Sequence, residues 1–393
     1  TPRRARTVPK KKNRSSKIPS KSKHAARVGH YDILDTNGLK TSGLTHKKSI
    51  RLKGVDRYQV KAESDLKPQL EHEKERAEQS KALLESLHPG CQAPESANYS
   101  GLSLMGKDLE RARFRNSLLK NCSFHSGKLR GTHWKNCNLS GVNFRKADLR
   151  GCILDGCNLT GADLRYANLE NARILDCELY AANFDNSTLS QAIIDHCDMG
   201  AQTFHNSNCK GIKLYSSQII HGFFDNGDFS GAEIRNMLFR SCTLTHTSFL
   251  KAHIEDTVLK GCDSFDEGPV FSEARMNNVS MKDCEFHAVE MAGTSLVNCL
   301  WERVDMDSVL LDDTEFRQVN FNESFLKDCY SLEKSPTFSQ CRLDHLVIDQ
   351  ADLAQAQFSQ SSFIATTIRD SDFAQWSLQH TGLDPETVIE NSD

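Results

Sequence analysis

Large apolar residues recur at every fifth position along the middle of the chain. Between residues 152 and 184 these residues are Leu154, Leu159, Leu164, Leu169, Ile174, Leu179 and Phe184. The residues two positions before them are small: Cys152, Cys157, Ala162, Ala167, Ala172, Cys177 and Ala182. A period of five matches neither the 3.6 residues of an amphipathic helix nor the two residues of a strand. Self-similarity at a fixed period is instead typical of a repeat array.

Two neighbouring repeats show the motif most clearly. Residues 162–166 (ADLRY) and 167–171 (ANLEN) each contain a small residue, then Asp or Asn, then Leu, then two mostly polar residues. This motif resembles that of the pentapeptide-repeat family. The resemblance implies an all-β solenoid, a right-handed quadrilateral parallel β-helix with one repeat on each side and twenty residues in each coil. The large residue and its small partner would then point inward, and the coils would stack through main-chain hydrogen bonds.

The repeat divides the chain into four parts. We expect about 14 coils over residues 100–383, with the first frame running from Leu104 to Leu259. The other parts are a basic, mostly irregular N-terminal arm (1–64), a helical cap or linker (65–90) and a C-terminal cap (384–393) with room for one helical turn.

Two shifts of the frame, each by two residues, interrupt the array near 260–270 and 327–337. Across them, residues 262–276 (CDSFDEGPVFSEARM) align with residues 329–343 (CYSLEKSPTFSQCRL). Two extra residues on one side of a coil must bulge outward, and each copy contains a Pro, which cannot donate to a ladder. We expect the bulges near one face, about three coils apart. Either they are a duplicated and tolerated irregularity, or they grip a partner at two points.

A helix is predicted for residues 66–88, with Pro68 in its first turn. Leu70, Ala77 and Leu84 form a narrow apolar stripe along it. We expect this stripe to cover the first coil, because the terminal coils of a solenoid otherwise expose apolar surface and ladder edges. A dimer seam is the alternative, and the sequence leaves a monomer or a homodimer open.

Charge is distributed very unevenly. Residues 1–150 carry 33 Lys/Arg and 14 Asp/Glu, whereas residues 151–393 carry 16 and 38. Residues 1–30 contain eleven Lys/Arg and no acidic residue, a composition that cannot fold alone and that suits an arm neutralising phosphates. The candidate polyanion-binding residues of this arm are Arg3, Arg4, Arg6, Lys10, Lys11, Lys12, Arg14, Lys17, Lys21, Lys23 and Arg27. The candidates in the first coils are Arg111, Arg113, Arg115, Arg145, Lys146 and Arg150. The densest acidic patch, a candidate protein-binding site, contains Asp305, Asp307, Asp312, Asp313 and Glu315.

Twelve of the fourteen cysteines occupy the small inward slot, the exceptions being Cys91 and Cys209. A buried free thiol packs as a small hydrophobe, so these cysteines replace Ala. Cys137, Cys157, Cys177 and Cys197 are twenty residues apart and are expected to stack in one column, where a thiol ladder for redox or metal chemistry is the alternative interpretation. So many free thiols favour a reducing intracellular compartment such as the cytoplasm. The Thr at position 1 also leaves an organelle matrix or a large assembly open.

Catalytic chemistry has little support in the sequence. The chain contains no HExxH, Walker, GxSxG or paired CxxC motif, and its Asp residues before the central Leu belong to the repeat. We therefore expect no enzyme activity, no cofactor and no metal. A membrane span is not expected either, because no apolar run approaches the ~18–20 residues that a span needs.

Three functions are compatible with these features. The first is a rigid scaffold or adaptor whose basic arm anchors it to nucleic acid or a nucleoprotein assembly, while its acidic body meets another protein. The second is implied by the resemblance, since family members mimic DNA and inhibit or protect type II topoisomerase (gyrase). The third is a secreted bacterial effector, for which the sequence shows no specific signature.

Overall fold

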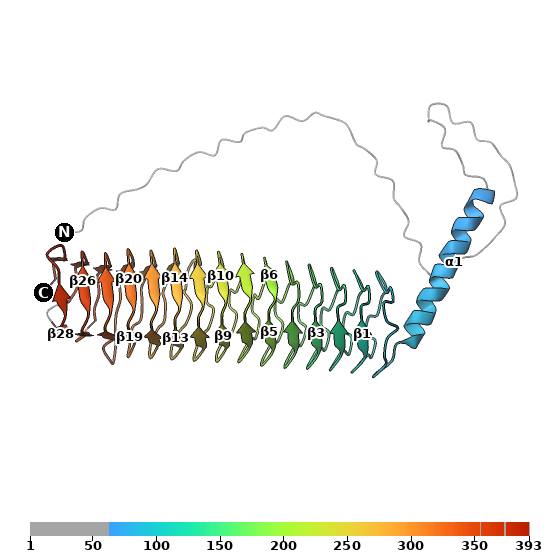
Figure 1. Ribbon diagram of the computed structural model, residues 1–393, viewed down its shortest axis with the longest axis horizontal. Helices are drawn as coiled ribbons and strands as arrows, with labels where there is room; N and C mark the ends of the chain where they lie inside the picture. The colour runs from blue at the N-terminus through green and yellow to red at the C-terminus, as the bar shows by residue number, and fades with distance from the viewer. Residues whose placement is uncertain (1–62, 354, 373–374, 393) are drawn as a thin grey trace, which may run out of the picture. The chain divides into compact units, whose positions relative to one another are not determined.

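The structure is a computed structural model that describes residues 63–353, 355–372 and 375–392. The predicted basic arm therefore lies almost entirely outside the described residues. The described part begins with helix α1 (Glu63–Ser86) and continues as a parallel β-solenoid of about 14 coils (Figure 1). The all-β solenoid that the resemblance implies is confirmed. Within the described ranges, we find no helix with the length and hydropathy of a membrane span.

Each repeat turns one corner of the coil. The second residue after each inward-facing large residue has a positive φ, as at Asn116 (51°), Asn121 (55°), Ser126 (55°) and Gly131 (66°). Asn and Gly adopt this left-handed conformation at low cost, which explains their frequency at the fifth position of the repeat. The next residue, in the small slot, faces inward again. Each five-residue repeat therefore contributes three residues to one side of the coil and two residues to a corner.

Every coil has four sides, numbered here in chain order. Side 1 is a 14-stranded parallel sheet, side 2 a 10-stranded sheet and side 3 a six-stranded sheet. Side 4 is held by single bridges, from Asp108↔Lys128 to Tyr330↔Asp352. Sides 2 and 3 begin as similar bridges and widen into strands toward the C-terminus.

The strands of the three sheets are short, and most contain three residues. Side 1 contains β1 (Arg113–Arg115), β2 (His133–Lys135), β3 (Ile153–Asp155), β4 (Arg173–Leu175), β5 (Ile193–Asp195), β7 (Lys213–Tyr215), β9 (Glu233–Arg235), β11 (His253–Glu255), β13 (Arg275–Asn277), β16 (Ser295–Val297), β19 (Glu315–Arg317), β22 (Thr337–Ser339), β25 (Gln357–Ser359) and β28 (Ser377–Gln379). Side 2 contains β6 (Asp198–Gly200), β8 (Gln218–Ile220), β10 (Leu238–Arg240), β12 (Val258–Lys260), β14 (Ser280–Lys282), β17 (Leu300–Glu302), β20 (Asn320–Asn322), β23 (Arg342–Asp344), β26 (Ser362–Ile364) and β29 (Gly382–Leu383). Side 3 contains β15 (Glu285–His287), β18 (Asp305–Asp307), β21 (Phe325–Lys327), β24 (Val347–Asp349), β27 (Thr367–Arg369) and β30 (Val388–Glu390).

The interior of the solenoid is filled with side chains. Phe184, Phe204 and Phe224 stack on one another with ring centroids 5.0 and 5.2 Å apart, as the twenty-residue spacing predicts. On side 1, Trp134 stacks on Phe114 at 4.1 Å. Where the small slot holds a hydroxyl, it donates inward to the main chain, as Ser207 Oγ does to the carbonyl of Phe204 at 2.7 Å. The interior is thus occupied by packed side chains.

Both frame shifts appear as 22-residue steps in the register. The first falls between Asp263, which still pairs with Thr243, and Val270, which pairs with Ser248. Phe249 and Phe271 nevertheless stack at 5.3 Å, so the inward frame is restored at once. This first bulge, residues 264–269, lies at the edge between sides 3 and 4.

The second bulge, residues 331–336, lies at a different edge. Tyr330 on side 4 still pairs with Leu310, whereas Thr337 on side 1 pairs with Glu315, 22 residues earlier. The two bulges are three coil steps apart, as expected, but they do not lie above one another. They occupy the two opposite edges of side 4 and frame it.

All fourteen cysteines are free and buried. Cys137, Cys157, Cys177 and Cys197 occupy equivalent positions of successive coils, and the backbone N–H of Cys157 lies 3.4 Å from Cys177 Sγ. A second column contains Cys242, Cys262 and Cys284. It could not be seen as a twenty-residue spacing, because the first frame shift makes its second step 22 residues.

Burial raises the pKa of the Cys152 and Cys209 thiols to about 12, so both remain protonated at neutral pH. No group of three or more His, Cys, Asp or Glu suited to a metal ion occurs within the described ranges.

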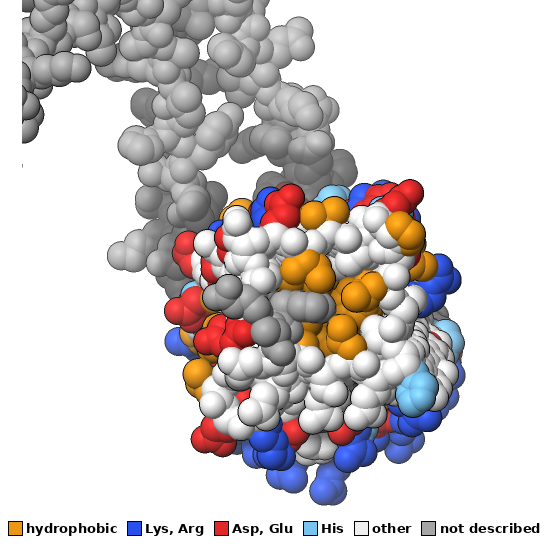
Figure 2. All heavy atoms as spheres, turned by 90° about the vertical axis from the view of Figure 1, so that its left-hand side faces the viewer, with side chains coloured by type: hydrophobic (Ala, Val, Ile, Leu, Met, Phe, Trp, Pro, Cys, Tyr) orange, Lys and Arg blue, Asp and Glu red, His pale blue; other side chains and the backbone are white. Residues whose placement is uncertain are grey.

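The two ends of the solenoid differ. At the N-terminal end, Leu83 and Leu84 of α1 pack against the core, and Lys107 Nζ donates to the carbonyl of Leu84. Ala77 is exposed, so the predicted stripe covers the first coil only near the end of the helix. At the C-terminal end, the helical turn predicted after Pro385 is wrong, because β30 continues the coil and pairs with β27. Figure 2 shows apolar side chains gathered at the centre of this end.

Candidate functional site

The eleven basic candidates of the arm, Arg3 to Arg27, lie outside the described residues, so the structure places only the six in the first coils. Three of these six lie together. Arg111 is at the edge between sides 4 and 1, and Arg113 and Arg115 project from β1. The next rung adds His133 and Lys135, which pair in register with Arg113 and Arg115. Burial, and then the charge of Arg113, lowers the pKa of His133. This end of side 1 is therefore basic.

The other three basic candidates lie elsewhere on the coil. Arg145 is on side 3, with its guanidinium carbon 5.1 Å from the ring centre of Tyr166. Arg150 is on side 4, where Nε and Nη2 donate to the two carboxylate oxygens of Asp148 at 2.8 and 2.6 Å. This fork lowers the pKa of Asp148. Lys146 lies at the edge between sides 3 and 4. The structure therefore does not bring these three residues together with the basic end of side 1.

The acidic candidates follow one another around a single coil. Asp305 and Asp307 belong to β18 on side 3, Asp312 is on side 4, and Glu315 belongs to β19 on side 1. Asp313 lies at the corner before Glu315, with a φ of 51°. Because the five residues span three sides, they do not form one flat surface. Their negative charge instead surrounds the coil that lies between the two bulges.

Two of these acids hold the second bulge. Asp312 Oδ1 accepts hydrogen bonds from the backbone N–H groups of Leu332 at 3.0 Å, and of Glu333 and Lys334 at 2.8 Å each. These bonds lower the pKa of Asp312 against the effect of burial. The Lys334 ammonium also pairs with Asp313 at 2.8 Å. Asp312 and Asp313 are thus structural anchors of the bulge.

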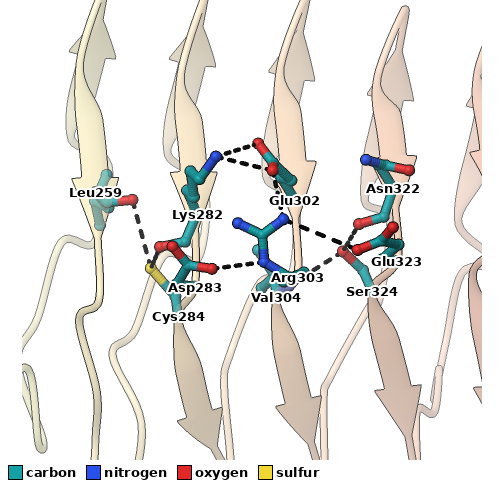
Figure 3. A network of polar contacts seen from close by, with 10 residues as sticks. All are labelled: Leu259, Lys282, Asp283, Cys284, Glu302, Arg303, Val304, Asn322, Glu323 and Ser324. Carbon is teal, nitrogen blue, oxygen red and sulfur yellow. Dashed lines mark hydrogen bonds and ion pairs between the residues drawn. The ribbon is translucent and has the colours of Figure 1, made fainter.

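Acids at the edge between sides 2 and 3 are neutralised by their neighbours (Figure 3). Lys282 Nζ lies 2.8 Å from both carboxylate oxygens of Glu302. Arg303 reaches Asp283 at 2.7 Å and Glu302 at 2.5 Å. This network balances much of the local negative charge.

Side 3 carries carboxylates in consecutive rungs. Asp263 pairs in register with Glu285, and Glu285 pairs with Asp305, so the three form a ladder at the coil spacing of about 4.8 Å. Burial, and then the charge of Glu285, raises the pKa of both Asp263 and Asp305. His287 lies 3.5 Å from Glu285 and 4.0 Å from Asp307. This ladder is the part of the acidic body where like charges face one another.

Replacing Asp305 by Asn is expected to stabilise the protein at neutral pH. A raised pKa means that the folded state disfavours the ionised carboxyl, so the wild-type side chain is best tolerated below its unfolded pKa of 3.8. Asn removes both the cost of partly burying a charge and the repulsion from Glu285, and the gain should be about 0.2–1 kcal/mol at pH 7. The gain should shrink as the pH falls toward 3.8.

Thermal unfolding of Asp305→Asn between pH 3.5 and pH 8 measures this difference. The matched control is Glu170→Gln, which removes a charge on side 4, away from the ladder. A gain that is independent of pH, or equal in the two variants, would contradict like-charge repulsion as its cause.

The bulges also expose apolar side chains that sequence reasoning missed. Phe265 and Leu332 are 72% and 75% exposed, the two highest values among the large hydrophobic side chains described. Both occupy the fourth position of the aligned segments, CDSF and CYSL. This shared apolar position was the available signal.

Comparison with known proteins gives one family match. A model of the pentapeptide repeat region matches residues 128–204. Among curated proteins, no sequence matches the chain. Solved structures similar to this chain include HetL, a pentapeptide repeat protein involved in heterocyst differentiation regulation from the cyanobacterium Nostoc sp. strain PCC 7120, with 19% identity over 61% of this chain and 89% of HetL (TM-score 0.20). They also include QnrB1, a plasmid-mediated fluoroquinolone resistance protein, with 19% identity over 49% of this chain and 91% of QnrB1 (TM-score 0.27). A third is Rfr23 from the cyanobacterium Cyanothece 51142, with 21% identity over 33% of this chain and 88% of Rfr23 (TM-score 0.20).

The matched region lies before the first bulge, where the coils follow one another in uninterrupted twenty-residue steps. On both sides of it, the same five-residue step places the same two positions inward, from Tyr99 to Phe363. The repeat resumes after each bulge in a frame shifted by two residues, with large side chains stacked inward again. Residues 128–204 therefore match the pentapeptide repeat region, and the described coils on both sides of them continue the same five-residue repeat.

Proposed function

We propose that this protein is a non-catalytic scaffold or adaptor of a reducing compartment. Its basic arm anchors it to a polyanion, either nucleic acid or a nucleoprotein assembly, and its acidic body presents a binding surface to another protein. The observation that carries this proposal is the division of charge along the chain, with most of the basic excess in the arm. Residues 1–150 have 19 more basic than acidic residues, and residues 151–393 have 22 more acidic than basic ones. Charge asymmetry of this size steers association.

The filled interior supports a role for the outer surface. Large inward side chains such as Trp134, Phe204 and Trp301 are fully buried and leave no room for a substrate inside the coil. Ligand sites are usually concave and lined by apolar groups with a few convergent polar ones. The exterior instead offers charged and bulged surfaces, which suit recognition of macromolecules.

The arm is expected to dominate binding to nucleic acid. A fluorescent duplex DNA, titrated with the full chain at 50 and at 200 mM salt, should lose about 10³–10⁵ in affinity between the two salts if the arm contacts 6–10 phosphates. A variant with the eleven Lys/Arg of residues 1–30 replaced by Gln should lose most of the affinity and most of the salt dependence.

The control variant replaces Arg111, Arg113 and Arg115 by Gln and leaves the arm intact. It should lose less affinity than the arm variant, because three charges release fewer counterions than eleven. Salt-independent retention, or retention that is unaffected by the arm substitutions, would contradict anchoring through the arm.

A second candidate function is mimicry of DNA toward a type II topoisomerase. The observation that favours it is the carboxylate ladder of Asp263, Glu285 and Asp305, whose charges recur at the coil spacing along side 3. A gyrase supercoiling assay separates the two proposals. Mimicry predicts inhibition or protection that survives neutralisation of the arm, whereas the scaffold predicts no effect on supercoiling.

A further inference from the structure

The outward positions of side 4 change character along the solenoid. In the N-terminal half they are polar and form ion pairs: Asp108 with Lys128 at 3.5 Å, Asp148 with Arg150 at 2.6 Å, and Asp228 with Lys210 at 3.1 Å. From the eighth to the twelfth outward pair, each pair contains an apolar residue. These residues are Leu250, Val270, Ala292, Leu310 and Tyr330. One side of one chain thus contains both a polar segment and an apolar strip.

The apolar strip lies where the two bulges frame side 4. Phe265 rises at the edge toward side 3, and Leu332 rises at the edge toward side 1, so each edge has an exposed apolar side chain. Tyr330, on the strip itself, is 38% exposed. A hollow of about 380 Å³ adjoins the first bulge and is lined by Glu267, Val270, Glu290 and Tyr330 among others. Strip, hollow and bulges form one continuous surface.

Both bulges are held in place by polar contacts. The second is fixed by the three N–H groups that donate to Asp312. In the first, the Gly268 N–H donates to the carbonyl of Ala288 at 3.3 Å, and Glu267 pairs with His246 Nε2 at 3.0 Å. The exposed side chains are therefore presented at fixed positions, which lowers the ordering cost of binding.

The surroundings of the strip are acidic. Residues 248–251, 265–273, 288–293, 310–315 and 330–334 contain eight Asp/Glu and two Lys, which pair with Glu273 and Asp313. A second copy of this chain docked through the same side would bring two such acidic sets together, and like charges placed in an interface suppress the wrong partner. The surface instead complements a ligand that is basic and apolar at once.

We propose that side 4 between the two bulges is the docking site for a basic, amphipathic helix of the partner protein. The proposal rests on the acidic body having the protein-binding role proposed above. From Leu250 to Tyr330 the strip spans four coil steps, or roughly 19 Å, which is the length of a helix of about 13 residues. The apolar face of the helix lies on Leu310 and its neighbours, and its Lys/Arg meet the acids at the edges.

The test measures binding of a fluorescent 14-residue helical peptide of Leu and Lys to the full chain. Two variants remove apolar contacts, Phe265→Ser/Leu332→Ser at the bulges and Leu310→Ser on the strip. Each should weaken binding by tenfold or more. The matched control, Met105→Ser/Tyr180→Ser, removes two exposed apolar side chains from other sides and should leave the affinity unchanged. A peptide with Gln for Leu and the same charge should bind the wild type at least tenfold more weakly.

Several results would overturn the docking site. They are absence of binding, equal binding by all variants, and a concentration-dependent dimer that the Leu310→Ser substitution abolishes, which would assign side 4 to a second copy. Retention of duplex DNA by the same proteins is measured in parallel. If the variants change neither peptide binding nor DNA retention, the docking site fails and the anchoring function stands; loss of arm-dependent retention in the wild type would instead remove the proposed function.

Discussion

Replacing Ala167 by Asp is expected to unfold the coils around it. Ala167 occupies the small inward slot before side 4 and is only 1% exposed. Its neighbours in the column one coil before and one coil after are Ala147 and Ser187, both buried and without charge. A carboxylate placed there is a buried charge with no counter-ion, which costs at least about 3 kcal/mol.

The control is the next residue along the chain. Asn168 points outward on side 4, and its Oδ1 accepts the backbone N–H of Glu170 at 3.0 Å, a bond that Asp can also accept. Asn168→Asp should therefore change the free energy of unfolding by no more than about 0.5 kcal/mol. Because solenoids can unfold locally, hydrogen exchange of the amides in the neighbouring coils is the measurement. Equal protection in the two variants would contradict the assigned inward and outward positions.

Replacing Phe224 by Ala should have the second large effect. Phe224 is fully buried, and its ring lies 5.2 Å from that of Phe204, 5.5 Å from Phe229 and 5.7 Å from Phe239. Removing the ring leaves a cavity between coils and should cost about 3–5 kcal/mol. Denaturant unfolding followed by near-ultraviolet circular dichroism measures the loss.

Phe223 provides the matched control, since it is the same residue type one position earlier. Its ring points outward on side 3 and is 44% exposed. Phe223→Ala should change stability by no more than about 0.5 kcal/mol, as is usual for a surface substitution. If both substitutions destabilise equally, the stacked rings are not the source of cohesion between these coils.

The coil could be predicted from the sequence because its inward slots tolerate few residue types. A large apolar residue at Leu164 and a small one at Ala162 are required by packing, and the same requirement returns every five residues. For the same reason both frame shifts could be located: Phe271 and Phe338 had to point inward again.

The positions of the bulges around the coil were harder to predict. Their sequences are alike, which suggested one shared face, but the first copy begins at side 3 and the second begins one side further along, at side 4. The edge of the coil at which a bulge lies is found only by counting sides through a 22-residue step, and no single residue determines it. The strip on side 4 was missed for the same reason, because Leu250, Val270 and Leu310 are far apart in the sequence and align only once the register is known.

The contacts of long side chains could not be predicted from the sequence either. The sequence makes Arg150 a candidate for polyanion binding, and the structure shows that its guanidinium also donates to Asp148 two residues away. The sequence makes Asp312 a candidate for protein binding, and the structure adds that it anchors a bulge that begins about twenty residues later. At the C-terminus, Pro385 suggested a turn, whereas the free edge of β27 offered Val388–Glu390 a ladder and a strand formed.

Disulfide trapping across neighbouring coils tests the register most directly. In parallel rungs the Cα atoms are about 4.8 Å apart, within the range that a disulfide spans. His253→Cys should bridge to Glu233→Cys, twenty residues earlier, and to Arg275→Cys, 22 residues later, because these residues are Cα partners. It should not bridge to Glu273→Cys, twenty residues later, which lies at a corner. Peptide mapping of the three double variants under non-reducing conditions should show the first two bridges and not the third. A bridge between positions 253 and 273 in preference to 253 and 275 would contradict the 22-residue step and, with it, the framing of side 4.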